Sequence, residues 1–434
     1  MNAKIILTGA LLLGQSIFWG EAAKIFFMIP VTTISEKNVY IPLIDALAER
    51  GHEVVVASIT KSKYKSKNIR EFVPCRYDQF VGDGFADPIE SRKQVGRYTS
   101  LALTEYGFIT NACEIVYKNP EFQKVITEKF DLVIKNAWCG HCFNGVLYKL
   151  QAPFINFNTM IPYNEVNEQT GARIPASFVP FAMGPARSIG KMSLFARLEN
   201  VLLDIHWTLF NKYIYYPAMD QISRKYLGPD IPSSEEINKN LSLVLSNSHF
   251  VINAPVPVLP DVVEVAGMHC LPPKPVPKDL DEFLSGDKDG FIYFSMGSMV
   301  NSKLFSPSVK KMFLSVFSKL KQRVLWKFEA DLTDLPPNVK IGKWLPQQDI
   351  LGHPNIRLFI THGGALSTQE AIYNGVPLVV MPVFADQDNN ARQAAEKGLA
   401  IMLEVTELTE EILLSAINKV LNDASYAKTA KDLS

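Results

Sequence analysis

Net charge, runs of like charge and internal repeats are all missing from this chain of 434 residues. Lys plus Arg and Asp plus Glu both number 44, so the formal net charge at pH 7 is zero. A neutral chain offers no electrostatic argument for binding nucleic acid, and we expect no such partner. The hydrophobic content of 47% and the charged content of 20% are typical of a globular protein, and the length suits two or three domains.

Cysteine is scarce, because the chain holds only five, and the odd number leaves at least one thiol free. Cys139 and Cys142 form a CxxC pair, but no second Cys/His pair stands at zinc spacing. We therefore predict no metal site. We expect the cysteines to be mostly buried small residues: Cys75, Cys113, Cys139, Cys142 and Cys270.

Hydrophobic runs long enough to cross a bilayer are absent after the first residues of the chain. Lys4 precedes the apolar stretch 5–18, and small residues follow at Gly20, Ala22 and Ala23. This order predicts a secretory signal peptide over 1–23, with an uncleaved anchor helix as the alternative. A glycosylation sequon at Asn240 fits a chain in the endoplasmic reticulum lumen or a secreted chain, without a membrane span after cleavage.

The first half of the mature chain, 24–253, begins with a strand–helix–strand pattern. The apolar run 24–30 predicts a strand buried on both faces, and a loop is expected over 31–38. Apolar residues then recur at helical spacing from Tyr40 to Leu47, Gly51 ends the helix, and 53–59 is a second apolar run. This βαβ unit predicts a parallel sheet.

Seven prolines crowd the next stretch, 254–280, which predicts a stiff linker between two domains. The alternation of strands and helices restarts over 281–434. We expect an α/β protein of two doubly wound, Rossmann-like domains that face a central cleft. Ligands bind such sheets beyond the carboxyl ends of the strands.

The second half contains a strand followed by a glycine turn and a helix. The strand ends before His362, Gly364 lies in the turn, and Ser367 and Glu370 lie on the helix. Glycines let a ligand approach the backbone, and the positive end of the helix favours a diphosphate. The alternative is that Ser367-x-x-Glu370 is only a capping box.

Two further groups are expected at the same sheet edge. Trp344 could stack on a base, with Gln347 beside it. Asp386 and Gln387 follow a buried strand, and a carboxylate beside an amide can accept from and donate to sugar hydroxyls. A base platform, a phosphate turn and hydroxyl ligands together predict a nucleotide-sugar site.

Four segments carry this pattern: Trp344-Leu-Pro-Gln-Gln-Asp-Ile-Leu-Gly-His-Pro-Asn, Phe359-Ile-Thr-His-Gly-Gly, Ser367-Thr-Gln-Glu-Ala and Pro382-Val-Phe-Ala-Asp-Gln387. They resemble the signature of the UDP-glycosyltransferases, the family of animal UDP-glucuronosyl- and UDP-glucosyltransferases. The resemblance, which spans 24–434, implies the GT-B fold, with the acceptor site mainly in the first domain and the donor site mainly in the second. It also implies inverting transfer from a UDP-sugar co-substrate to a small lipophilic acceptor, with no metal and no further cofactor.

The resemblance also implies a role for each residue. Trp344 would stack on uracil, with Gln347 at the same end, and Glu370 would bind the ribose hydroxyls. His362, the backbone around Gly364 and Ser367 would contact the diphosphate, as would Ser298 in another strand-end loop. Asp386 and Gln387 would hold the donor sugar.

The chain departs from the family at the catalytic pair. The family places a histidine after the first strand and an aspartate in the first domain, and these positions fall on Glu36 and Asn136. No histidine occurs between Ala22 and Arg50. In one hypothesis Glu36 is the base and Asn136 orients it by hydrogen bonding. In the other, Glu36 is a solvated loop carboxylate and the protein is a catalytically impaired UDP-sugar or lipophile binder.

Other features bear on substrate and assembly. No arginine lies near Pro255–Pro257 to meet a sugar carboxylate, which favours glucose over glucuronate. The apolar, aromatic-rich region 80–210 favours a lipophilic acceptor. A nicotinamide-dependent dehydrogenase would need a G-x-G-x-x-G after the first strand, which is absent. Relatives continue beyond the position of Ser434, so we expect a C-terminally truncated chain; the oligomeric state, a homo-oligomer included, stays open.

Overall fold

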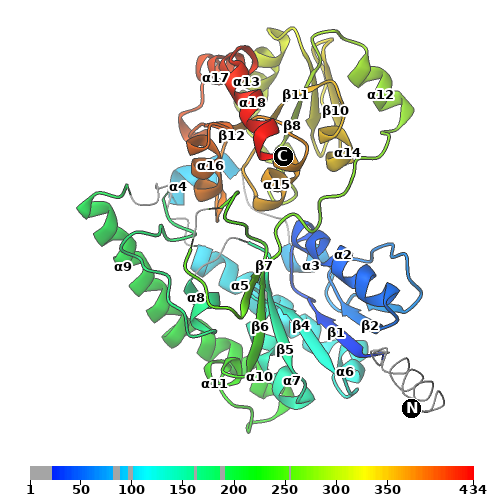
Figure 1. The fold of residues 1–434 in the computed structure, drawn as a ribbon, viewed down its shortest axis with the longest axis vertical. Helices are drawn as coiled ribbons and strands as arrows, with labels where there is room; N and C mark the ends of the chain where they lie inside the picture. Colours follow the sequence, from blue (N-terminus) through cyan, green and yellow to red (C-terminus); the bar gives the residue numbers. More distant parts are fainter. Residues whose placement is uncertain (1–21, 82–87, 96–100, 161–163, 186–190, 254–255) are drawn as a thin grey trace, which may run out of the picture.

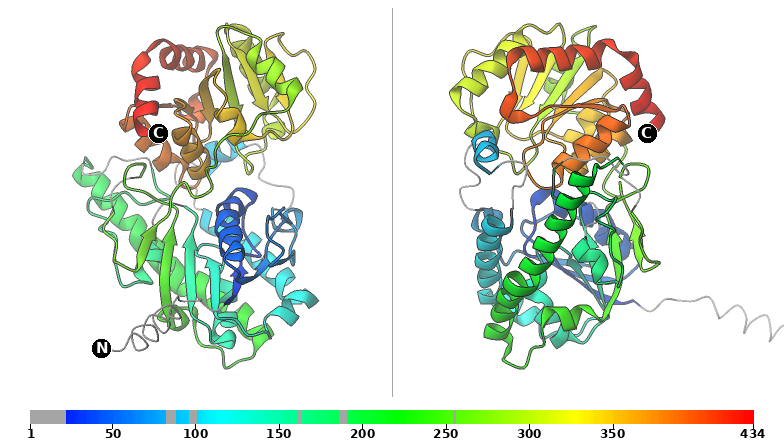
Figure 2. Two further views of the ribbon diagram at one scale, coloured as in Figure 1. Left: turned by 45° about the vertical axis from the view of Figure 1, so that its right-hand side comes forward. Right: turned by 90° about the vertical axis from the view of Figure 1, so that its left-hand side faces the viewer.

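The structure is a computed structural model that describes residues 22–81, 88–95, 101–160, 164–185, 191–253 and 256–434. The predicted signal peptide lies outside these residues except for Ala22 and Ala23. Two α/β domains, each built on a parallel sheet, lie end to end (Figures 1 and 2). The prediction of two doubly wound domains is therefore confirmed.

The first domain holds a seven-stranded parallel sheet in the order β3-β2-β1-β4-β5-β6-β7. Its strands are β1 (Lys24–Met28), β2 (Glu53–Ala57), β3 (Ile69–Phe72), β4 (Leu132–Asn136), β5 (Phe154–Asn158), β6 (Leu241–Ser246) and β7 (Val262–Glu264). Its helices include α2 (Ile34–Glu49), α3 (Tyr77–Val81), α5 (Leu101–Lys118), α6 (Pro120–Val125), α7 (Asn144–Leu150), α8 (Asn164–Glu168), α9 (Leu194–Phe210), α10 (Tyr216–Leu227) and α11 (Ser234–Asn238). Short helical turns are η2 (His141–Phe143) and η3 (Asn211–Tyr215).

The second domain holds a six-stranded parallel sheet in the order β10-β9-β8-β11-β12-β13. Its strands are β8 (Phe291–Ser295), β9 (Arg323–Lys327), β10 (Val339–Gly342), β11 (Ile356–Thr361), β12 (Leu378–Val380) and β13 (Ala400–Met402). Its helices are α12 (Lys278–Ser285), α13 (Pro307–Ser318), α14 (Gln347–Leu351), α15 (Ala365–Tyr373), α16 (Gln387–Glu396), α17 (Glu410–Asn422) and α18 (Ala424–Leu433), with turns η4 (Ser302–Leu304) and η5 (Val405–Glu407). One more helix, α4 (Pro88–Val95), comes from the first half of the chain but lies against this domain (Figure 1).

Both sheets reverse their strand order at one point, between β1 and β4 in the first and between β8 and β11 in the second. Such switch points leave a crevice at the carboxyl ends of the strands, where ligands bind. The apolar strands at the centre of each sheet are buried on both faces, which explains their continuous hydrophobic runs.

The loop predicted over 31–38 is wrong in part, because α2 already begins at Ile34. Thr33 caps this helix, its hydroxyl accepting a hydrogen bond from the backbone N–H of Glu36 (3.1 Å) while the Glu36 carboxylate accepts one from the backbone N–H of Thr33 (2.9 Å). This reciprocal capping box starts the helix one turn earlier than its apolar periodicity indicates.

Part of the proline-rich stretch 254–280 belongs to the first sheet. Within it, β7 pairs in parallel with β6 as an edge strand and begins two residues after Pro260. An edge strand tolerates neighbouring prolines because one of its sides needs no ladder hydrogen bonds. Residues 265–277 lead without regular secondary structure to α12.

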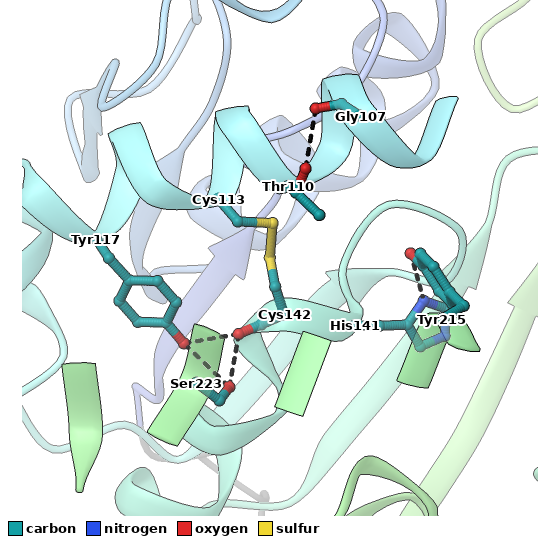
Figure 3. The surroundings of a disulfide bond; sticks show 8 residues. All are labelled: Gly107, Thr110, Cys113, Tyr117, His141, Cys142, Tyr215 and Ser223. Atoms are coloured by element: carbon teal, nitrogen blue, oxygen red, sulfur yellow. Dashed lines mark hydrogen bonds between the residues drawn. A yellow bond between two sulfur atoms is a disulfide. The ribbon is translucent and has the colours of Figure 1, made fainter. Parts of the chain in front are cut away.

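A disulfide links Cys113 on α5 to Cys142 on η2 (Figure 3). The expectation that the cysteines serve only as buried small residues is therefore wrong for this pair, while Cys75 and Cys139 are buried and belong to no disulfide. The hydroxyls of Tyr117 and Ser223 both donate to the carbonyl of Cys142, at 2.7 Å each. The bond therefore anchors the turn after β4 to the helices behind the sheet. In the part of the chain that the structure describes, no helix has both the length and the apolarity needed to span a bilayer.

Candidate nucleotide-sugar site

A cavity of about 470 Å³ lies between the domains, where the two switch points face each other. Residues after β1 and β5 line it from the first domain, and the loops after β8, β11 and β12 line it from the second. All but one of the predicted site residues line this cavity: Glu36, Ser298, Trp344, Gln347, His362, Gly364, Ser367, Glu370, Asp386 and Gln387. The exception is Asn136, which lies just behind the wall at the end of β4.

His362, directly after β11, is enclosed by two glycine turns. Gly297 has a φ of +78°, and a Cβ there would lie 2.5 Å from Cε1 of the imidazole. A Cβ on Gly364 would lie 2.7 Å from Nε2. Burial, together with the positive charge of Lys327, lowers the pKa of His362 to about 4. The imidazole is therefore neutral at pH 7. It would bind a diphosphate by donating a hydrogen bond from its N–H group rather than through a positive charge.

The capping-box alternative for Ser367 and Glu370 is wrong. Helix α15 begins after Gly364, and no side chain caps its N-terminus. The two side chains instead accept hydrogen bonds from Nε2 of Gln347, at 3.0 Å for the Ser367 hydroxyl and 2.6 Å for the Glu370 carboxylate. Burial raises the pKa of Glu370 to about 7. The start of α15 thus points uncapped N–H groups at the cavity, as an anion site requires.

Trp344 presents a flat aromatic surface to the cavity, and the residue is 66% exposed. The ammonium of Lys327 lies 5.8 Å from the ring centroid and donates to the carbonyl of Gly297 at 2.9 Å. Lys327 also pairs with Glu329. Sequence analysis missed this lysine, although a charged residue at the carboxyl end of the apolar strand β9 was a usable signal.

Asp386 and Gln387 begin α16 beyond the end of β12. The Gln387 side-chain oxygen accepts hydrogen bonds from the backbone N–H groups of Val383 (2.8 Å) and Phe384 (3.1 Å), which leaves its NH₂ group as a donor. Asp386 accepts one from the Asn390 amide at 2.9 Å. Burial raises the pKa of Asp386 to about 6, and the negative charge of Glu36 contributes to the rise. The pair can therefore offer an acceptor and a donor to one ligand.

Glu36 is not a solvated loop carboxylate, because it is 6% exposed and lies in the first turn of α2. Besides its capping bond to Thr33, it accepts hydrogen bonds from the hydroxyls of Thr32 (3.1 Å) and Thr159 (2.5 Å). Asn136 reaches it indirectly, by donating to the Thr32 hydroxyl at 3.3 Å. Asn136 therefore does not orient Glu36 by a direct hydrogen bond, as the hypothesis expected, but is linked to it through the Thr32 hydroxyl.

Asn136 has a second task in the first domain. Its side-chain oxygen accepts hydrogen bonds from the backbone N–H groups of Trp138 (2.7 Å) and Cys139 (3.3 Å). These bonds fix the turn after β4, which brings the Trp138 ring to the cavity. The first-domain wall around it is apolar and is formed by Phe80, Phe108, Ile109, Trp138 and Met160.

Within the described ranges, no group of three or more His, Cys, Asp or Glu side chains is placed to hold a metal ion. The carboxylates of the cavity are instead engaged by amides and hydroxyls, as described for Glu36, Glu370 and Asp386. The site therefore consists of hydrogen-bonding side chains, an aromatic face and a helix N-terminus.

Known proteins share both the sequence and the fold. A family model described as "UDP-glucoronosyl and UDP-glucosyl transferase" matches residues 29–434. The UDP-glucosyltransferase 2 of Dactylopius coccus is 32% identical over 423 residues, covering 95% of this chain and 80% of that protein. The UDP-glucuronosyltransferase 2B14 of Oryctolagus cuniculus is 32% identical over 411 residues, covering 90% of this chain and 76% of that protein.

Among solved structures, the glycotransferase of kitacinnamycin aligns with a TM-score of 0.61 at 17% identity, over 95% of this chain and 94% of that one. The UDP-glucose: anthocyanidin 3-O-glucosyltransferase in complex with UDP aligns with a TM-score of 0.60 at 14% identity, over 95% of this chain and 93% of that one. These similarities confirm the GT-B fold. The family match over nearly the whole chain shows that the protein belongs to the UDP-glucuronosyl and UDP-glucosyl transferases and is a glycosyltransferase that uses a UDP-sugar donor.

Proposed function

We propose that this enzyme transfers glucose from UDP-glucose to a hydroxyl group of a small lipophilic acceptor, with inversion at the anomeric carbon. One observation carries the proposal: a polar set of donor-binding side chains and the buried carboxylate of Glu36 face the same cavity from opposite domains. The apolar wall beside Glu36 gives the acceptor a place to bind.

In this proposal the donor binds along the second domain. The uracil stacks on Trp344, and the ribose hydroxyls donate to Glu370. The diphosphate lies at the uncapped start of α15, near His362 and Ser298. The sugar lies at the far end of the cluster, where Asp386 accepts from one hydroxyl and the Gln387 amide donates to another.

The chemistry then needs a base. The acceptor hydroxyl gives its proton to Glu36 while its oxygen forms a bond to the anomeric carbon of the sugar. The bond from that carbon to the diphosphate breaks, and UDP leaves with the electron pair. The neutral His362 and the N–H groups of α15 stabilise the negative charge that builds up on the leaving oxygen.

The preference for glucose rests on charge. The cations that line the described cavity are Lys274 and Lys327, and Lys327 is already paired with Glu329. At the proposed sugar position the charged group is the carboxylate of Asp386. A neutral hexose suits this position better than a uronate, whose carboxylate Asp386 would repel.

A second candidate function is UDP-sugar binding with little catalysis. The observation that favours it is the engagement of Glu36, whose two carboxylate oxygens accept three hydrogen bonds, two of them within the start of α2. A carboxylate that serves the fold in this way has less freedom to take a proton from an acceptor.

The variant Glu36→Gln separates the two functions. Glutamine also serves at the third position of a capping box, so the start of α2 is kept while the charge is removed. If Glu36 is the base, turnover of UDP-glucose with a simple phenol falls by about 100-fold or more, while melting temperature and UDP affinity stay at wild-type values. A strongly acidic nitrophenol, which is ionised without help, should recover most of the loss.

Unchanged turnover in Glu36→Gln would remove Glu36 from the mechanism. No turnover of wild type with any phenol, together with binding of UDP-glucose, would establish the binding function instead.

The disulfide between Cys113 and Cys142 supports a place in the secretory pathway. Structural disulfides form and persist in oxidising compartments such as the endoplasmic reticulum lumen. If this is the one disulfide of the enzyme purified from that compartment, alkylation under denaturing conditions should modify three of the five cysteines, namely Cys75, Cys139 and Cys270. Modification of one cysteine would instead indicate a second disulfide.

A further inference from the structure

Residues from the first half of the chain contact the start of α16, the helix whose first turn carries the proposed sugar ligands. Asn389 donates through its amide to the backbone carbonyls of Phe181 (2.8 Å) and Ala182 (2.7 Å) of the first domain. Its neighbour Asp388 is buried and forms an ion pair with Arg92.

Arg92 belongs to α4, a helix that precedes the second domain by about 200 residues in sequence yet packs against it. Ile89, one turn earlier on α4, is 5% exposed and is part of the hydrophobic core of the second domain. Figure 1 shows α4 beside α16, and both lie in the upper domain of that view. The first half of the chain therefore contributes a structural piece to the donor-binding domain.

The contacts of Arg92 use every N–H group of its guanidinium. Nη1 and Nη2 donate to the two carboxylate oxygens of Asp388, each at 2.8 Å. Nε and Nη2 donate to Glu404 at 2.8 and 2.9 Å, and Nη1 also donates to the carbonyl of Val383 at 3.1 Å. These are five hydrogen bonds for five donors, and only the planar fork of an arginine can make them all.

Two of these partners bracket the proposed sugar-binding pair. Val383 precedes Asp386 and Gln387, and its backbone N–H donates to the Gln387 side chain. Asp388 follows the pair directly. Arg92 thus holds both ends of the turn 383–388 while it makes no contact with the cavity itself, which its side chain does not line.

We propose that Arg92 is a positioning residue for the donor sugar: from the first half of the chain it fixes the turn that presents Asp386 and Gln387. This inference rests on the proposed function, because it takes these two residues as the sugar ligands. If Arg92 acts through that turn alone, its loss weakens the contacts to the sugar and leaves the contacts to uracil, ribose and diphosphate in place.

The test compares two ligands on the full chain. Calorimetry gives the dissociation constants of UDP-glucose and of UDP for wild type, Arg92→Gln and Arg92→Lys. We expect both variants to weaken UDP-glucose binding about tenfold or more while UDP binding changes less than about twofold. The lysine should not rescue the effect, because one ammonium cannot bridge Asp388, Glu404 and the Val383 carbonyl.

A matched control is Arg323→Gln in the same domain. Arg323 donates to the backbone carbonyls of Glu282, Phe283 and Gly286, away from the cavity. Its loss should lower the melting temperature and leave both affinities unchanged, so it reports the effect of destabilising the domain. If Arg92→Gln does not fold, the isosteric Asp388→Asn removes the same ion pair and replaces it in the experiment.

The outcomes separate the two proposals. Equal weakening of UDP and UDP-glucose, or no weakening at all, overturns the role of Arg92 and leaves the donor site intact. A third outcome is that wild type binds UDP and every UDP-sugar of a donor panel, UDP-glucose included, with equal dissociation constants. In that case Asp386 and Gln387 are not sugar ligands, and both proposals are wrong.

Discussion

At the scale of single residues, the cavity holds carboxylates that the folded protein keeps away from water. Burial raises the pKa of Glu370 to about 7 and that of Asp386 to about 6. Each shift means that the fold stabilises the protonated form, so ionisation at neutral pH weakens the fold. Such groups are expected where a ligand supplies hydroxyl partners that the protein alone lacks.

The sign of this effect gives a prediction for Glu370. Its pKa is about 7 in the fold against an ordinary value of 4.5, so its contribution to stability is full below pH 4.5 and is lost as pH rises through 7. We expect the free energy of unfolding of wild type to fall, relative to Glu370→Gln, by about 2 kcal/mol between pH 5 and pH 8. Urea titrations at both pH values measure it.

Glutamine at position 370 can still accept the hydrogen bond from Gln347, so the variant removes the charge and little else. Parallel stability curves for the two proteins would show that the carboxylate is not destabilised by burial. The same variant should bind UDP less tightly at pH 8, because an amide oxygen accepts ribose hydroxyls less strongly than a carboxylate.

The residues of the site show what a sequence pattern can and cannot predict. Ser367-x-x-Glu370 and Thr33-x-x-Glu36 both match the capping-box pattern, yet only the second forms one. At α15 the helix already begins after Gly364, because the glycine turn brings the backbone close to His362. Ser367 and Glu370 therefore point at the cavity instead. The local pattern alone does not contain the register that decides this.

At the scale of elements, the proposed phosphate end of the site depends on two turns that lie against each other. The loop after β8 contributes Gly297, and the loop after β11 contributes Gly363 and Gly364. Gly297 and Gly363 both have positive φ, at +78° and +85°. The imidazole of His362 occupies the space that a Cβ on Gly297 or Gly364 would need.

We therefore expect Gly297→Ala to displace His362 and to weaken UDP binding about tenfold or more. The matched control is Gly171→Ala, which has a similar φ of +87° but no atom within 4 Å of its added Cβ. Both substitutions strain the backbone by about 1–2 kcal/mol, so both should lower the melting temperature. Calorimetry with UDP should separate them.

Wild-type UDP affinity in Gly297→Ala would mean that His362 can move without loss, and that its contact with the diphosphate contributes little. Equal losses in both glycine variants would trace the effect to stability rather than to the position of the imidazole.

Most elements could be predicted because their cause is local. The buried strands at the switch points form continuous apolar runs, and the strand predicted to end before His362 is β11, which ends at Thr361. The early start of α2 was missed because its first turn is capped by side chains rather than marked by apolar residues. The edge strand β7 was missed because it has only three residues and follows a proline.

At the scale of the whole molecule, the strand orders explain why the chemistry collects between the domains. Each sheet opens its crevice at one switch point, and the two crevices form a single cavity. This arrangement could be predicted from the sequence, because strands and helices alternate in both halves of the chain. The placement of α4 could not be predicted from the sequence. This helix has eight residues, and its contact with the second domain depends on Arg92, whose distant partners are not indicated by any periodic pattern.

The cavity is divided between the domains, and a tryptophan marks each side. Trp138 belongs to the apolar wall of the first domain, and Trp344 to the second domain beside Lys327. If acceptor and donor occupy these sides separately, replacing each tryptophan by alanine should impair the binding of a different ligand. Trp344→Ala should weaken UDP binding about tenfold or more, since stacking of a base on an aromatic ring contributes about 1–3 kcal/mol.

Trp138→Ala should raise the KM for a phenolic acceptor severalfold, because it removes apolar surface from that wall, and should change the UDP dissociation constant less than about twofold. Steady-state kinetics with the acceptor varied, together with calorimetry of UDP, measures both. If acceptor and donor instead share one site, the two variants should change the acceptor KM and the UDP dissociation constant to a similar extent. Divided effects would show that the two-domain architecture itself separates acceptor from donor, with Glu36 placed between them at the start of α2.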